Sequence, residues 1–131
     1  MSGRMGDAIE ISVVVRDLEK AVERYSTLFG LTVHHRSESK EFGFKNAILP
    51  LGKGHIELME PTDPDKAVGK FLAKRGEGVY LIGFDCADVP DAVKHLKNEG
   101  VRVEDRRSDI AWIHPAETNG LFVELRKPEK Y

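Results

Sequence analysis

Residues 9–22 read IEISVVVRDLEKAV, and residues 80–93 read YLIGFDCADVPDAV in the second half of the chain. In both stretches a strand-like segment leads through an aspartate, Asp17 or Asp88, into a segment with helical spacing. A second pair also corresponds, because residues 56–61 read IELMEP and residues 123–128 read VELRKP. Internal similarity of this kind predicts that one supersecondary unit occurs twice.

The first copy is expected to begin with a strand over residues 9–15. Its residues alternate, so Ile9, Ile11 and Val13 share one face while Glu10 and Ser12 share the other. Asp17 suits a helix N-cap and Gly30 a helix end, which predicts a helix of roughly 12 residues between them. The apolar strand face should pack on this helix. Further elements are expected as strands at 31–36, 42–49 and 55–60, a short helix at 66–74 and a linker at 75–78.

The second copy repeats this order. It predicts a strand at 79–86, a helix at 89–99 capped by Asp88, and strands at 101–104, 110–114 and 120–126. The expected fold class is α+β, built from two tandem β-α-β-β-β modules at about 8–61 and 79–126. With 131 residues, the chain is expected to form a single domain, 1–131.

The composition excludes several classes of protein. A net charge of -2 with scattered basic residues does not favour a nucleic-acid-binding surface. No apolar run is long enough to span a membrane, and the first residues do not resemble a signal peptide. The single cysteine, Cys86, excludes an internal disulfide and suits a reducing compartment. We therefore expect a cytoplasmic protein that binds neither nucleic acid nor a membrane.

Several segments resemble one branch of a known superfamily. The stretches VRDLEKA (15–21), IELMEP (56–61), KFLAKRGEG (70–78) and IHP (113–115) are similar to those of methylmalonyl-CoA epimerases. These enzymes are members of the vicinal oxygen chelate superfamily, also called glyoxalase/bleomycin-resistance/dioxygenase. The resemblance covers residues 8–126 and implies a curved mixed sheet around a central cleft, and a homodimer.

The resemblance also implies four metal-ligand positions, which fall on Glu10, Glu57, Leu81 and Glu124. The family has histidines at the first and third of these, and both are missing here. Leu81 cannot bind any metal, and the imidazoles that favour zinc or cobalt are gone. A divalent metal held by Glu10, Glu57 and Glu124 remains one possibility.

The strand pattern places the same glutamates independently of the resemblance. His55 and Glu57 share a face, as do Phe122, Glu124 and Arg126, and in each strand the opposite face is apolar. Carboxylates gathered in one cleft raise one another's pKa. The repulsion could be relieved by a hard cation such as magnesium, manganese or calcium, by protonation of one carboxyl, or by pairing with Arg126, His55 or Ser12.

These residues lead to a hypothesis and two alternatives. In the first, Glu57, Glu124 and Glu10 are catalytic, and the substrate contacts His55, Ser12, Arg126 and Phe122. The protein would be an isomerase or lyase that removes a proton alpha to the carbonyl of a small acyl thioester or 2-oxo acid. The first alternative is a metal-free, small-molecule-binding protein of the bleomycin-resistance type. The second is a regulatory paralogue that associates with an intact epimerase.

Overall fold

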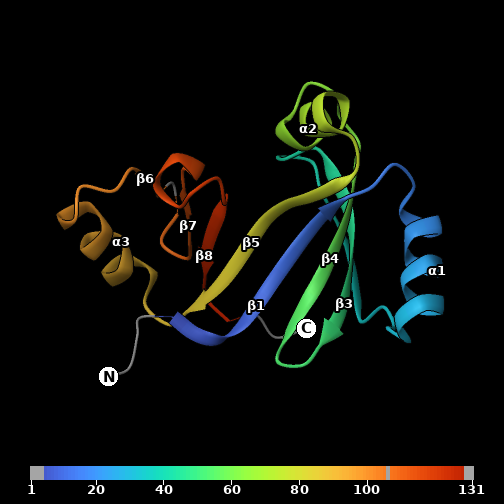
Figure 1. Cartoon of the computed structure of the whole chain (residues 1–131), viewed down its shortest axis with the longest axis horizontal. Coiled ribbons are helices and arrows are strands. Elements are labelled where there is room, and N and C mark those ends of the chain that lie inside the picture. The colour runs from blue at the N-terminus through green and yellow to red at the C-terminus, as the bar shows by residue number, and fades with distance from the viewer. Residues whose placement is uncertain (1–4, 106, 129–131) are drawn as a thin grey trace. The chain divides into compact units, whose positions relative to one another are not determined.

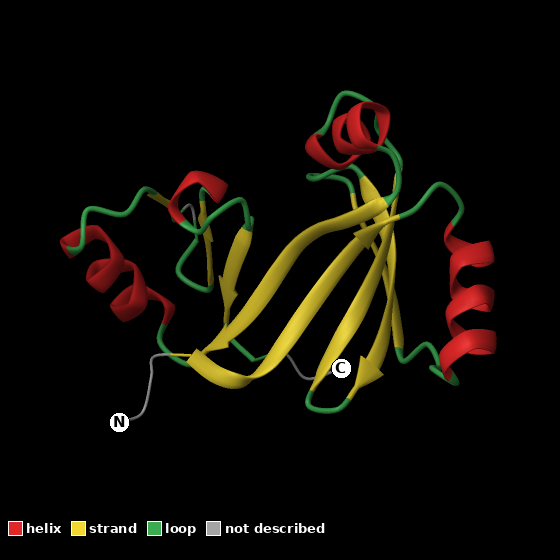
Figure 2. Cartoon of the chain, viewed as in Figure 1, coloured by secondary structure: helices red, strands yellow, loops and turns green. Residues whose placement is uncertain are grey.

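The computed structural model describes residues 5–105 and 107–128. Figures 1 and 2 show the helices and strands of these residues, whose bounds are β1 (Met5–Val14), α1 (Leu18–Phe29), β2 (His35–Ser39), β3 (Phe44–Leu51), β4 (Gly54–Pro61), α2 (Ala67–Arg75), β5 (Gly78–Cys86), α3 (Val89–Asn98), β6 (Val103–Glu104), β7 (Ile110–Ile113), the 3-10 turn η1 (Pro115–Glu117) and β8 (Val123–Arg126). The order is β-α-β-β-β twice, with α2 between the copies. The predicted α+β class is confirmed.

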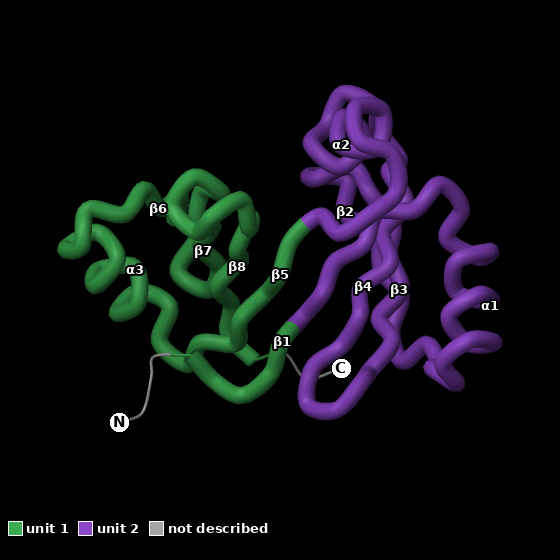
Figure 3. Tube along the Cα trace, viewed as in Figure 1, with its two compact units in different colours: residues 1–9, 81–130 green, residues 10–80, 131 purple. Residues whose placement is uncertain are grey.

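The chain divides into two compact units (Figure 3). Among the described residues, unit 1 contains residues 5–9, 81–105 and 107–128, and unit 2 contains residues 10–80. The boundaries therefore fall inside β1 and β5, so that each of these strands contributes residues to both units.

Unit 2 is a sheet in the order β2-β3-β4-β1. β1 runs parallel to β4, and β3 runs antiparallel to both of its neighbours. Helix α1 covers one face (Figure 1), and its predicted caps are confirmed. Asp17 accepts a hydrogen bond from the Lys20 backbone N–H at 3.1 Å, and Gly30 ends the helix with φ 69°. The buried core on this face comprises Val15, Leu18, Ala47, Leu49 and Leu58.

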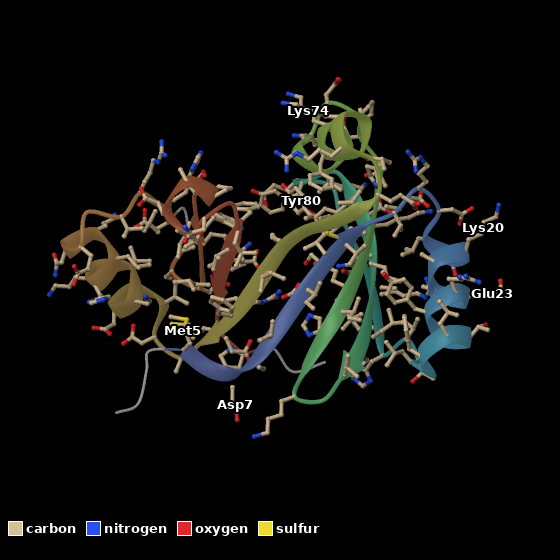
Figure 4. The ribbon with its side chains drawn as sticks, viewed as in Figure 1. Met5, Asp7, Lys20, Glu23, Lys74 and Tyr80 are labelled. Atoms are coloured by element: carbon tan, nitrogen blue, oxygen red, sulfur yellow. The ribbon has the colours of Figure 1, made fainter. Side chains whose placement is uncertain are left out.

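Helix α2 belongs to the opposite side of the unit 2 sheet. Val68 packs there with Val14 and Met59, which are nearly inaccessible to solvent. The Phe71 ring meets Tyr80 edge-on, with ring centroids 5.2 Å apart. Figure 4 labels Tyr80 where β5 begins and Lys74 at α2. Polar side chains, among them Ser12, Asn46 and Glu57, lie on the same face as this apolar cluster.

Unit 1 is a sheet in the order β5-β8-β7-β6 packed with α3. β5 and β8 are parallel, and the other pairs are antiparallel. Asp88 caps α3 by accepting from the Asp91 backbone N–H at 3.0 Å. The core consists of Cys86, Val89, Ala92, Val93, Ala111, Ile113, Val123 and Leu125.

Two expectations are corrected, one about the bounds of a strand and one about packing. The strand expected at 31–36 instead covers His35–Ser39, because Leu31 and Val33 pack against the core beneath α1 before pairing begins. The apolar face of β1 is also only partly covered. Val13 and Val15 contact the α1 core, but Ile9 is 55% exposed.

The far end of the apolar stripe on α1 is uncovered as well, since Leu28 and Phe29 are 52% and 62% exposed. Lys20 and Glu23 project from the outer side of the same helix (Figure 4).

Among the described helices, none is long and apolar enough to cross a membrane.

Candidate functional site

Polar side chains from neighbouring strands meet on the α2 side of the unit 2 sheet. The register pairs Glu10 with His55 and Ser12 with Glu57, and residues paired across strands share a face. Glu10 is 3% exposed, Ser12 0% and Glu57 9%. The sheet thus holds two acidic side chains away from water, and a buried charge is costly unless it is paired.

Ser12 bridges the two carboxyl groups. Its Oγ lies 2.7 Å from Glu57 Oε1 and 3.2 Å from Glu10 Oε1. A hydroxyl group carries one hydrogen, so it can donate to one carboxyl and must accept from the other if both contacts are hydrogen bonds. The arrangement therefore fits a pair of carboxyl groups that share one proton.

The pKa of Glu57 agrees with this picture. Burial, and then the charge of Glu10 and a hydrogen bond with Glu10, raise the pKa of Glu57 from 4.5 to about 8, while the hydrogen bonds with Ser12 and Asn46 act in the opposite direction. Near neutral pH the neutral acid is therefore the dominant form of Glu57. A buried carboxyl with a raised pKa is suited to act as a general acid or base.

Asn46 is a member of this cluster that the sequence analysis did not single out. Its Nδ2 donates to Glu57 Oε2 at 2.5 Å, and its Oδ1 accepts from the Ser37 N–H at 3.0 Å and from the Ser37 hydroxyl at 2.7 Å. The alternation of residues 44–49 could have indicated Asn46, because it places this one amide on the same strand face as Phe44 and Ile48, which is otherwise apolar.

His55 completes the group next to Glu10. Its Nε2 lies 3.5 Å from Glu10 Oε2, and its side chain is 14% exposed. This distance exceeds that of a well-formed hydrogen bond but suits an ion pair when the imidazole is protonated. Of the expected site residues, Glu10, Ser12, His55 and Glu57 thus lie together in unit 2.

The other expected site residues belong to unit 1. Glu124 accepts from Trp112 Nε1 at 3.0 Å and from the Arg126 guanidinium at 3.3 Å. Phe122 directly precedes β8, and its carbonyl accepts from the Ile82 N–H at 3.0 Å. Leu81 is 7% exposed. In this unit, the positive charge of Arg126 and the hydrogen bond from Trp112 both stabilise the Glu124 carboxylate.

The side chains of unit 2 suit hydrogen-bond donors better than a metal ion. The Ser12 hydroxyl hydrogen-bonds to one oxygen of Glu57 and the Asn46 amide donates to the other, so both oxygens that a cation would need are already engaged. Leu81 stands at a position where the family has a metal-binding histidine, and its side chain has no atom that can bind a metal. Among residues 5–105 and 107–128, no three His, Cys, Asp or Glu side chains group as a potential metal site. These residues do not fit the metal that the family resemblance implies.

Comparison with known proteins gives a consistent result. The Glyoxalase/Bleomycin resistance protein/Dioxygenase superfamily matches residues 10–114. The uncharacterized protein YqjC of Bacillus subtilis is 32% identical over 91% of this chain and 90% of its own length. The mitochondrial methylmalonyl-CoA epimerase of Homo sapiens is 27% identical over 94% of this chain and 74% of its own length.

Solved structures extend the similarity to the fold. A variant of Streptomyces coelicolor methylmalonyl-CoA epimerase, in complex with 2-nitronate-propionyl-CoA, is similar with a TM-score of 0.86 and 32% identity over 94% of each chain. A methylmalonyl-CoA epimerase in complex with methylmalonyl-CoA and NH4+ has a TM-score of 0.84 and 35% identity, covering 95% of this chain and 93% of its own.

Proposed function

This chain belongs to the glyoxalase/bleomycin resistance protein/dioxygenase superfamily as a methylmalonyl-CoA epimerase-like member, and we propose that it is an isomerase of small acyl-CoA thioesters. The proposed reaction removes the proton alpha to the thioester carbonyl and returns a proton to the same carbon. The substrate class is supported by the acyl-CoA ligands of the similar structures.

The observation that carries this proposal is the buried pair Glu10 and Glu57, bridged by Ser12. Epimerisation needs a base that accepts the alpha proton and an acid that returns one. A carboxyl pair holding one proton contains both, since the ionised member can accept while the neutral member donates. The total number of protons in the pair is unchanged after one turnover.

The intermediate is an enolate, and its oxygen requires a hydrogen-bond donor. We assign this role to His55, which lies beside Glu10 on the same face. No step of the proposed reaction uses a metal ion, because the side chains around Glu57 do not fit one.

The experiment is exchange of the alpha proton in D2O, followed by NMR and mass spectrometry. Methylmalonyl-CoA, propionyl-CoA and a 2-oxo acid serve as test compounds, each with protein treated with a chelator. We expect the wild-type protein to exchange a thioester, and Glu57→Gln to slow the exchange by about 100-fold or more, as is typical for loss of a general acid or base.

Glu60→Gln is the matched control. Glu60 lies on the same strand but faces α1, where its carboxylate accepts from the Leu18 backbone N–H at 2.8 Å, an acceptor role that Gln retains. We expect its exchange rate to equal that of the wild type. Exchange at equal rates in wild type and Glu57→Gln, or no exchange of any thioester, would contradict the proposal. Tight binding without exchange would instead support a bleomycin-resistance-type binding protein.

A further inference from the structure

The orientation of the Asn46 side chain is fixed by Ser37. Both the N–H and the hydroxyl of Ser37 donate to Asn46 Oδ1. An amide oxygen only accepts and an amide nitrogen only donates, so Oδ1 must face β2 and Nδ2 must face Glu57. A flip of the amide would lose both bonds from Ser37 and bring two oxygens together.

This orientation determines which oxygen of Glu57 can carry a proton. Glu57 Oε2 accepts from Asn46, so the acid hydrogen of neutral Glu57 belongs on Oε1, which lies 2.7 Å from Ser12 Oγ. Ser12 then accepts from Glu57 and donates to Glu10 Oε1 at 3.2 Å.

We propose that Asn46, held by Ser37, is a positioning residue that turns the protonated oxygen of Glu57 toward Ser12 and Glu10, so that a proton passes between the two carboxyl groups. In this transfer the O–H bond of Glu57 breaks as an O–H bond forms on Glu10, and where Ser12 relays the proton it gains one O–H bond as its original one breaks. The negative charge moves from Glu10 to Glu57, and no further reactant is needed. The catalytic part of this inference rests on the proposed function, whereas the orientation of Asn46 does not.

The hydrogen bonding of Asn46 is measured first, by NMR of side-chain amides. The chain contains three asparagines and no glutamine, so only Asn46, Asn98 and Asn119 give such signals. Asn98 and Asn119 are exposed and serve as internal references, while Asn46 is 7% exposed. We expect the Asn46 amide hydrogens to exchange with solvent at least about tenfold more slowly than the references, because buried hydrogen-bonded groups are protected.

Ser37→Ala should reduce this protection, because one of the two bonds that hold Oδ1 is lost. Ser39→Ala is the matched control on the same strand, since its hydroxyl accepts from the Phe42 backbone N–H and does not contact Asn46. An Asn46 amide that exchanges as fast as Asn98 would overturn the inference.

The catalytic consequence is measured on the same variants. We expect Ser37→Ala to lower kcat for alpha-proton exchange by roughly tenfold with little change in KM, because a misplaced catalytic group slows the chemical step. Asn46→Ala should lower kcat further, and Ser39→Ala should leave it unchanged. An unchanged kcat in Ser37→Ala, despite lost amide protection, would overturn the positioning role.

Two outcomes separate this inference from the proposed function. If the wild type exchanges no thioester, the proposed function fails and the catalytic role of Asn46 fails with it, while the amide measurement still tests the hydrogen bonds that hold Asn46. If the wild type exchanges its substrate and Glu57→Gln does not, but Ser37→Ala and Asn46→Ala are both fully active, only the positioning role fails.

Discussion

Glu57 couples the stability of the protein to pH at the scale of one residue. Burial and the charge of Glu10 raise its pKa from 4.5 to about 8, so the folded protein keeps a proton that the unfolded chain releases above pH 4.5. Stability contributed by this group is fully present below that pH and is lost as the pH rises toward 8.

We therefore predict that the free energy of unfolding of the wild type falls with rising pH, relative to that of Glu57→Gln. The difference between the two proteins should change by on the order of 3 kcal/mol between about pH 5 and pH 8, because each pKa unit corresponds to roughly 1.4 kcal/mol. Urea unfolding at several pH values measures it, and the titrating groups that do not interact with Glu57 cancel in the difference. Parallel curves for the two proteins would contradict the shifted pKa.

The sequence predicted the positions of individual side chains where alternation alone was sufficient. The phase of β1 and β4 puts Glu10, Ser12, His55 and Glu57 on one face, as the paired register shows. Asn46 was missed because its importance comes from partners on two other strands, Ser37 and Glu57. Such contacts depend on pairing across the sheet, which the sequence of one strand does not contain.

At the scale of the elements, Gly69 controls how α2 packs. A Cβ at this position would lie 2.4 Å from the Asp63 carbonyl oxygen and 2.7 Å from Pro64 Cα, both backbone atoms that cannot move alone. Helix α2 would have to shift, and it carries Val68 into contact with Val14 and Met59.

We predict that Gly69→Ala lowers the free energy of unfolding by about 2 kcal/mol or more, despite the better helix propensity of alanine, because overpacking displaces the helix. Lys70→Ala, at the next and exposed helical position, should change it by less than about 0.5 kcal/mol. Thermal and urea unfolding of both variants provide the measurement. Equal stability of the two variants would contradict this prediction, because it would mean that the backbone at Asp63 and Pro64 moves away from the added methyl group at little cost.

Local signals predicted the helices better than the short strands. Asp17 with Gly30 bounds α1, and Asp88 begins α3, because capping depends on neighbouring residues. The last strand was expected from residue 120 but begins at Val123. A turn occupies the preceding residues, where Asn119 and Gly120 have φ 60° and 92° and the Thr118 hydroxyl donates to the Leu121 carbonyl at 2.5 Å.

At the scale of the whole molecule, each unit has its own core. Leu125 is buried in unit 1 and Leu58 in unit 2, at 1% and 0% exposure. Yet β1 and β5 each supply residues to both units, so the chain passes between them within continuous strands. Unfolding of one unit would release the ends of β1 and β5 that continue directly into the other unit, which favours a single cooperative transition.

We predict that Leu58→Ala and Leu125→Ala each lower the free energy of unfolding by roughly 2–5 kcal/mol, through lost contacts and a cavity. The single tryptophan, Trp112, lies in β7 of unit 1, so its fluorescence reports that unit alone, whereas circular dichroism reports both. If unfolding is cooperative, Leu58→Ala in unit 2 must shift the Trp112 transition together with the circular dichroism transition. A Trp112 transition that stays at the wild-type midpoint while circular dichroism shows an earlier step would mean that the units unfold separately. In that case the group formed by Glu10, Ser12 and Glu57, which lies in unit 2, could be lost while unit 1 remains folded. The proposed activity would then disappear before the tryptophan signal changes.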